Sequence, residues 1–119
     1  MSSTWVKELA KRRKIWVYTQ AVDFRKQIDG LVQIIENEME TSSSEGLYVF
    51  QNRQKDKIKI IVWDRNGYLL GYKRLSRGRF DFPIRSEETV SMTAEELSDL
   101  LSGMPVIQLS VNGQKLYTH

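Results

Sequence analysis

Hydrophobic positions in the first third of the chain predict a strand followed by a helix. Ile15 to Thr19, IWVYT, is rich in β-branched and aromatic residues, which favours a strand. From Phe24 to Met39 apolar residues recur at helical spacing, and Asp23 stands where an amino-terminal cap belongs. We therefore expect a core-packing helix with an acidic outer face after the first strand.

The pattern then changes to the alternation typical of strands. Three apolar runs, residues 47–51, 57–63 and 68–75, are separated by short polar stretches. Asn66-Gly67 between the last two predicts a tight hairpin, because both residues adopt positive φ easily. The middle of the chain is therefore expected to be an antiparallel meander.

The predicted hairpin register divides the side chains between two faces. With Asn66 and Gly67 as the loop, Trp63 lies opposite Leu70 and Lys59 opposite Arg74. Lys73 falls on the face expected to be the core side, so it must reach solvent at the sheet edge unless the register is wrong. The proposed binding face contains Lys57, Lys59, Ile61, Trp63, Leu70, Tyr72 and Arg74, and the core face contains Ile58, Ile60, Val62, Leu69, Lys73 and Leu75.

The remaining segments predict short elements. Residues 80–84 read as a strand, and residues 89–92 as a brief pairing segment. Thr93 and Glu96 form a capping box that opens a leucine-rich helix. The last residues, 106–119, contain a second Asn-Gly turn and predict a small hairpin or an added edge strand. The whole order predicts an α+β fold: a single antiparallel sheet, a meander around the Asn66-Gly67 hairpin, with two main helices packed on one face.

Length and composition limit the classes of function. A chain of 119 residues predicts one domain, residues 1–119, and the absence of cysteine excludes disulfides. The one histidine, His119, excludes a structural zinc site of the usual Cys/His kind, and we expect no metal or other cofactor. No apolar run is long enough for a membrane span or a signal peptide, which predicts a cytoplasmic protein without a membrane partner.

Catalytic residues are hard to assemble from this sequence. Asp23, Asp64 and Asp81 could be imagined as a metal-binding triad of a small nuclease, but each has a simpler role, as helix cap, turn residue and strand-surface residue. There is no glycine-rich phosphate loop. We therefore expect no catalytic residues and no enzymatic activity.

The charge is strongly segregated, although the net charge is only +3. Residues 53–85 carry ten cations and three anions, residues 1–14 carry five cations and one anion, and the rest of the chain is acidic. Such a block is the pattern that a polyanion site requires. A short basic helix or arm at residues 1–14 is a weaker candidate, since basic runs often mark solvated helix ends.

Cations alternate with aromatic rings in the central block, which suits nucleic acid because cations neutralise phosphates and rings stack on bases. The alternative is an ordinary solvated face whose long cationic stems lie over the rings. The residues alone favour neither. The candidate nucleic-acid-binding residues are Lys57, Lys59, Trp63, Tyr72, Arg74, Arg77, Arg79 and Arg53, with possible additional contacts from Lys11, Arg12, Arg13 and Lys14.

Three blocks of the sequence resemble one family. In chain order, the sequence resembles the TnpB accessory proteins of bacterial insertion sequences of the IS-sixty-six type in the blocks AVDFRKQIDGL, VFQNRQKDKIKIIVWDRNGYLLGYKRLSRGRFDFP and MTAEELSDLLSGM. These are unrelated to the RNA-guided nucleases that share the TnpB label. The resemblance covers residues 17–104, leaving 105–119 as an extension, and departs from the family pattern at Gln27, Ser76 and Phe82, none of which removes a cation.

The resemblance implies a protein encoded beside a larger transposase and needed for efficient transposition. Its expected partners are therefore DNA at the transposon ends and the transposase of the same element. Our first hypothesis is a non-enzymatic accessory protein that binds nucleic acid. The alternative is a protein-interaction adaptor that recruits or activates the transposase without binding DNA itself. The oligomeric state is not predicted.

Overall fold

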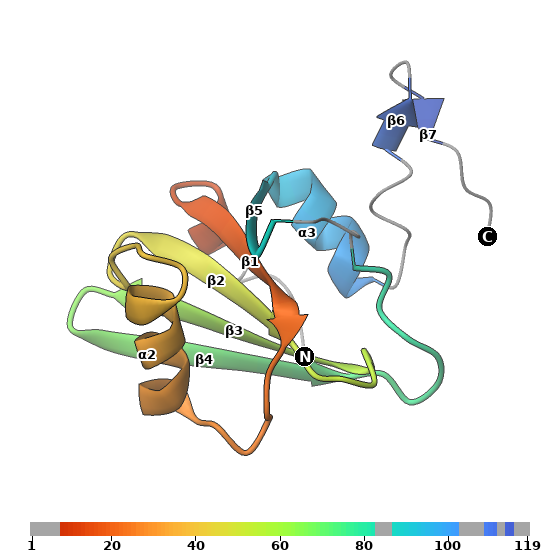
Figure 1. Cartoon of the computed structure of the whole chain (residues 1–119). Helices are drawn as coiled ribbons and strands as arrows, with labels where there is room; N and C mark the ends of the chain where they lie inside the picture. The colour runs from red at the N-terminus through yellow and green to blue at the C-terminus, as the bar shows by residue number, and fades with distance from the viewer. Residues whose placement is uncertain (1–7, 83–86, 103–108, 112–113, 116–119) are drawn as a thin grey trace.

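A computed structural model describes residues 8–82, 87–102, 109–111 and 114–115 of the chain. Five strands form one sheet in the order β4-β3-β2-β1-β5 (Figure 1). A further pair, β6 and β7, forms a separate antiparallel hairpin near the carboxyl end. The elements are β1 (Lys14–Ala21), α2 (Ile28–Asn37), β2 (Gly46–Gln51), β3 (Lys57–Asp64), β4 (Gly67–Arg74), β5 (Thr89–Met92), α3 (Ala94–Leu101), β6 (Leu109–Val111) and β7 (Gln114–Lys115).

The sheet is mixed, so the prediction of a purely antiparallel sheet is wrong, although the α+β class holds. β1 and β2 run parallel, with Lys14 beside Gly46 and Val17 beside Val49. The cause is α2, which carries the chain from the far end of β1 back to the end where β1 began. A parallel neighbour needs a crossover of this kind. The other neighbours in the five-stranded sheet are antiparallel.

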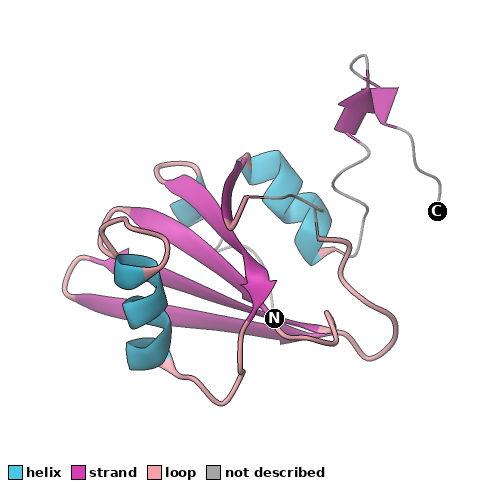
Figure 2. Ribbon diagram, viewed as in Figure 1, coloured by secondary structure: helices cyan, strands magenta, loops and turns pink. Residues whose placement is uncertain are grey.

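Both faces of the sheet are buried, so the prediction of two helices on one face is also wrong. In β2, Leu47 and Val49 pack in one cluster with Leu97 of α3, whereas Tyr48 and Phe50 pack in another with residues of α2. Figure 2 shows the two helices well separated across the sheet. The signal was present in the nearly continuous apolar run of β2, which is typical of a strand covered on both faces.

The β3–β4 hairpin turns one residue earlier than predicted. Its loop is Arg65-Asn66, and Asp64 pairs with Gly67. Arg65 takes the positive φ of 59°, and Asn66 N–H donates to the Asp64 carbonyl at 2.5 Å. The pairing is therefore shifted by two residues, so Lys59 faces Tyr72. A shift of two leaves every side chain on its predicted face, and it brings Trp63 and Tyr68 together edge to face, with ring centroids 4.9 Å apart.

The two main helices begin in different ways. Asp23 does not cap α2: its carboxylate accepts hydrogen bonds from Arg25, and the N-cap position is Gln27, whose side chain makes no capping bond. The capping box of α3 is confirmed. Glu96 N–H donates to Thr93 Oγ1 at 3.0 Å, and Thr93 N–H donates to Glu96 Oε1 at 2.9 Å.

The predicted strand at residues 80–84 does not form within the described residues, and residues 83–84 lie outside them. Phe80 and Phe82 are nevertheless buried in the cluster on the α3 side of the sheet. The apolar pattern of this segment therefore reflects two rings buried in the core and not a strand paired in the sheet. The segment between β4 and β5 is anchored to the sheet by these two rings.

Candidate nucleic-acid interface

The β2–β3 turn and the chain that leaves β4 lie side by side at one end of the sheet (Figure 1). Leu75 N–H donates to the Asp56 carbonyl at 2.9 Å, and Phe80 N–H donates to the Lys55 carbonyl at 2.7 Å. Burial of Phe80 in the core holds the second contact in place. Two segments separated by a complete hairpin are thereby joined.

The buried Asn52 fixes the shape of the β2–β3 turn. Its Oδ1 accepts from Lys57 N–H at 3.0 Å, and its Nδ2 donates to Asp56 Oδ1 at 2.6 Å and to Gln54 Oε1 at 3.1 Å. The bond from Asn52 lowers the pKa of Asp56, with a smaller contribution from Lys57. Lys55 adopts a positive φ of 61°, which completes the turn. The backbone that presents the neighbouring cations is therefore well ordered by local hydrogen bonds.

Six cations gather at this end of the sheet, against the two carboxylates Asp56 and Asp81. Within the described residues, only one of the six forms an ion pair, Lys57 with Asp56 at 3.7 Å. The other five side chains make no hydrogen bond or ion pair with a described residue, and four of them are exposed. We call this set the connection end: Arg53, Lys55, Lys57, Arg74, Arg77 and Arg79.

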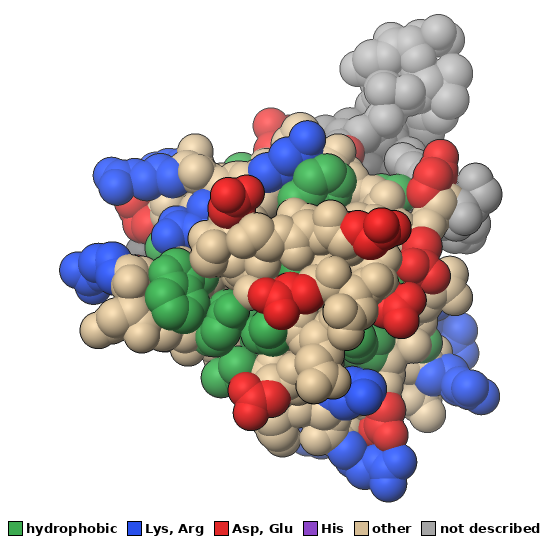
Figure 3. Space-filling model, turned by 60° about the vertical axis from the view of Figure 1, so that its left-hand side comes forward, with side chains coloured by type: hydrophobic (Ala, Val, Ile, Leu, Met, Phe, Trp, Pro, Cys, Tyr) green, Lys and Arg blue, Asp and Glu red, His purple; other side chains and the backbone are tan. Residues whose placement is uncertain are grey.

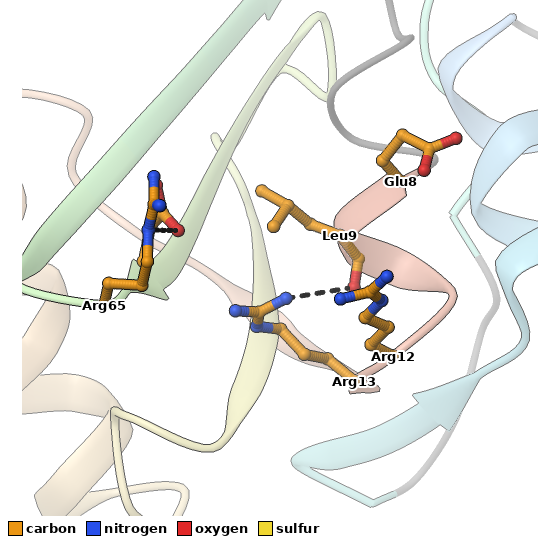
Figure 4. A pocket seen from close by; sticks show the side chains of 6 residues that line it. Glu8, Leu9, Arg12, Arg13 and Arg65 are labelled. Atoms are coloured by element: carbon orange, nitrogen blue, oxygen red, sulfur yellow. Dashed lines mark hydrogen bonds and ion pairs between the residues drawn. The ribbon is translucent and has the colours of Figure 1, made fainter.

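A second group of cations lies at the opposite end, beside the β3–β4 turn (Figure 4). Arg13 donates to the Trp63 carbonyl at 3.0 Å and to the Leu9 carbonyl at 3.4 Å. Arg65 pairs with Asp64 at 3.4 Å around an open hollow of about 570 Å³. We call this set the hairpin end: Lys11, Arg12, Arg13, Lys14 and Arg65.

The two lysines of the hairpin end also have partners close to them in the sequence. Lys11 Nζ lies 3.3 Å from a carboxylate oxygen of Glu8. Lys14 Nζ lies 4.6 Å from the centre of the Trp16 ring. Most of the hairpin-end cations therefore take part in contacts within the fold.

Two lysines of the hairpin strands point into the protein. Lys59 is 5% exposed, and its Nζ donates to the carbonyls of Phe24 at 2.9 Å and Lys26 at 2.7 Å. Burial lowers the pKa of Lys59, and the Asp23 carboxylate partly opposes this shift. Lys73 donates to the Leu101 carbonyl at the end of α3. Lys73 therefore lies on the predicted core face of the hairpin, and this hydrogen bond gives its ammonium group a partner there. Both ammonium groups have structural partners.

The two aromatic candidates lie in different surroundings. Tyr72 is 46% exposed, with its ring centroid 6.4 Å from that of Phe24. Trp63 is half-buried against Tyr68 near the hairpin end. The structure therefore places Tyr72, but not Trp63, toward the connection end of the hairpin.

The cations do not form one continuous sheet-wide patch on the face shown in Figure 3. There, Lys and Arg side chains lie in separate groups around the margin, and acidic side chains lie across the middle. Hydrophobic side chains are exposed between them. The cations on that face therefore do not make one continuous basic surface.

Comparison with known families identifies the chain. The sequence model of the family described as "IS66 Orf2 like protein" matches residues 13–110. The chain belongs to this family. Family membership associates the chain with transposition of insertion sequences, in an accessory role. The resemblance seen in the sequence is confirmed.

Two relatives from Sinorhizobium fredii (strain NBRC 101917 / NGR234) are similar over most of their length. "Uncharacterized protein y4jC" is 35% identical over 92 residues, which are 76% of this chain and 79% of that protein. "Uncharacterized protein y4hO" is 32% identical over 92 residues, which are 76% of this chain and 80% of that protein. No solved structure matches significantly.

The three carboxylates considered for a nuclease do not come together as one group. Asp64 is at the hairpin end, Asp81 follows the connection end, and Asp23 is bound by Arg25. No group of three or more potential metal ligands occurs among the described residues.

None of the helices in the described part of the chain is long and apolar enough to cross a membrane.

Some residues of the site were not among the sequence candidates. Lys55 lies in the central basic block, in the same polar turn as the candidate Arg53, so charge alone could have included it. Phe24 and Arg25 lie more than thirty residues before the hairpin, yet they border Tyr72 and Lys57. No local signal in the sequence indicates that proximity, because Lys59 creates it through tertiary hydrogen bonds.

Proposed function

We propose that this family member is a non-enzymatic accessory protein of DNA transposition that binds DNA through the connection end. The observation that carries this proposal is the meeting of six cations from two chain segments, residues 53–57 and 74–79. Five of the six have no ionic partner among the described residues. Two backbone hydrogen bonds hold these segments together.

Clustered like charges without counterions repel one another, so they do not serve the stability of the fold. They do serve binding to a polyanion, because each phosphate neutralised releases condensed counterions. Arg74, Arg77 and Arg79 are exposed, and a guanidinium group matches the geometry of phosphate oxygens. These groups position the protein on the DNA backbone and do not by themselves select a sequence.

Measurement of duplex DNA binding against salt tests the proposal. If all six connection-end cations contact phosphates, the log–log slope of affinity against salt is about −5. In the double variant Arg77→Ala and Arg79→Ala, the slope becomes shallower by about 2. Both side chains are exposed and without described partners, so the variant should fold as the parent does.

The control keeps the charge and removes only the guanidinium geometry. A variant with Arg77→Lys and Arg79→Lys should retain most of the slope, because lysine also neutralises phosphates. Absence of duplex binding at low salt would overturn the proposal. Binding to the transposase after nuclease treatment, with no binding to DNA, would favour the adaptor function in its place.

A further inference from the structure

An open groove separates the loop after β1 from the β3–β4 hairpin. Its volume is about 660 Å³, and its apolar lining consists of Phe24, Leu70 and Tyr72. Its polar lining comes from Asp23, Arg25, Gln27, Lys57 and Lys59. A volume of this size is typical of a site that takes a small, largely apolar group.

The groove continues toward the connection end. An adjoining hollow of about 410 Å³ shares Asp23, Phe24 and Lys57 with it and extends to Arg53 in the β2–β3 turn. Two connection-end cations therefore lie along one side of a continuous depression. An anionic chain seated there would run from the aromatic residues to the proposed DNA-binding surface.

The wall that faces the hairpin is held in shape by hydrogen bonds within the protein. Lys59 binds the carbonyls of Phe24 and Lys26 from beneath the loop. Arg25 donates to Asp23 through its backbone at 2.9 Å and through its guanidinium group at 2.6 Å. Lys26 N–H also donates to the Asp23 carbonyl at 3.0 Å. A preformed groove loses little conformational entropy when it is filled.

The exposure of the Tyr72 ring is not explained by packing within the protein. Its side chain is 46% exposed, and its hydroxyl makes no hydrogen bond with a described residue. Its ring lies at 54° to that of Phe24, on the side of the hairpin that forms the groove. An exposed aromatic ring beside cations is the combination that binds single-stranded nucleic acid, because every base has a flat face that can stack.

We propose that this groove binds an unpaired segment of DNA, with one base stacked on Tyr72 and the neighbouring phosphates on Lys57 and Arg53. This inference rests on the proposed function and adds a second mode of DNA binding to it. The connection end holds the DNA backbone by charge, and the groove recognises a base that is not in a duplex. A paired base cannot enter, because it is stacked within the helix.

Fluorescence anisotropy with a labelled oligothymidine and a blunt duplex of the same length tests this assignment. Tyr72→Ala should weaken binding of the oligothymidine about tenfold, since stacking on an aromatic ring is lost. The affinity for the blunt duplex should change less than about twofold. Tyr72→Phe keeps the ring and should bind oligothymidine almost as well as the parent.

Leu69→Ala is the matched control, because Leu69 is the other exposed large apolar residue of β4 and lies on the opposite face. It should leave both affinities unchanged, and circular dichroism checks that each variant folds. Equal oligothymidine affinities of Tyr72→Ala and the parent would overturn the groove assignment. Duplex binding that still depends on Arg77 and Arg79 would then leave the proposed function standing, whereas failure of the parent to bind either DNA would overturn both.

Discussion

The two ends of the β3–β4 hairpin are both basic, yet they use their cations differently. At the hairpin end, Arg13, Lys11 and Arg65 bind carbonyls or carboxylates of the protein. At the connection end, five of six cations have no such partner among the described residues. β3 spans eight residues, so the two groups are about 23 Å apart at about 3.3 Å per residue.

This difference shows that a basic sequence run is not by itself a binding surface. The run KRRK, Lys11 to Lys14, is the densest in the chain, but three of its four members contact groups of the protein: Lys11 pairs with Glu8, Arg13 binds the Trp63 carbonyl and Lys14 lies over the Trp16 ring. The connection end is assembled from shorter runs, and five of its six cations have no ionic partner in the part of the chain that the structure describes. The proposed interface therefore differs from the hairpin end in the number of cations without a partner in the fold, and not in local charge density.

The largest expected effect is on DNA affinity, and it compares the two ends at equal charge. Replacing Arg74, Arg77 and Arg79 by Gln should lower duplex affinity about a hundredfold near 0.1 M salt, because three phosphate contacts are lost. Replacing Lys11, Arg12 and Lys14 by Gln removes the same charge but should lower affinity less than about threefold. Filter binding or anisotropy at fixed salt measures both. Equal losses would mean that net charge, rather than its location, determines binding.

The next effect compares a buried lysine with a partly exposed one on the same strand. Lys59→Met keeps the apolar stem but leaves two carbonyls without their donor, so the free energy of unfolding should fall by about 2 kcal/mol. Lys57→Met, two positions earlier on the same face, should change it by less than about 0.5 kcal/mol. Urea denaturation measures both values. A Lys59 variant as stable as the parent would show that removing the buried charge offsets the lost hydrogen bonds.

A smaller effect is expected at the hairpin end. Arg13→Ala removes the bonds to the Trp63 and Leu9 carbonyls and should lower the free energy of unfolding by about 1 kcal/mol. Arg12→Ala is the neighbouring control, since this exposed side chain has no hydrogen bond or ion pair with a described residue, and should be nearly neutral. Thermal and urea unfolding compare the two. If the variants were equally stable, the hairpin end would not use its cations as the geometry indicates.

The smallest effect concerns Arg25, an engaged cation beside the groove. Its hydrogen bonds lower the pKa of Asp23 from 3.8 to about 2. Because the folded pKa is depressed, this contribution to stability is present above about pH 4 and is lost as the pH falls through about 2. NMR titration should show the Asp23 pKa rising toward 3.8 in Arg25→Ala, with a partial rise in Arg25→Lys. An unchanged pKa would contradict the pairing.

Several elements were predictable because their signals are local. The capping box of Thr93 and Glu96 depends on residues three positions apart, and the β3–β4 hairpin depends on one turn. The predicted faces of the two strands are correct although the predicted turn is wrong, because a shift of two residues leaves each side chain on the same face. The same alternation did not reveal that both faces are covered, since coverage depends on where α2 and α3 pack.

The candidate site was predictable only in part. The charge pattern predicted Arg74, Arg77 and Arg79 as binding residues. It predicted Lys59 as one too, although Lys59 is buried. The sequence holds no sign that its ammonium group meets the carbonyls of a distant loop. The role of Lys73 at the end of α3 was hidden for the same reason.

By itself, the sequence determined the family, the α+β class, the alternation of the hairpin and the segregation of charge. These properties depend on residue type, spacing and order, which are local. Only the tertiary structure decided that β1 and β2 run parallel, which helix covers which face of the sheet, and which cations have no ionic partner among the described residues. The physical reason is that a lysine or arginine binds the nearest uncompensated carbonyl or carboxylate, and the neighbours of a side chain in space are set by the packing of distant segments.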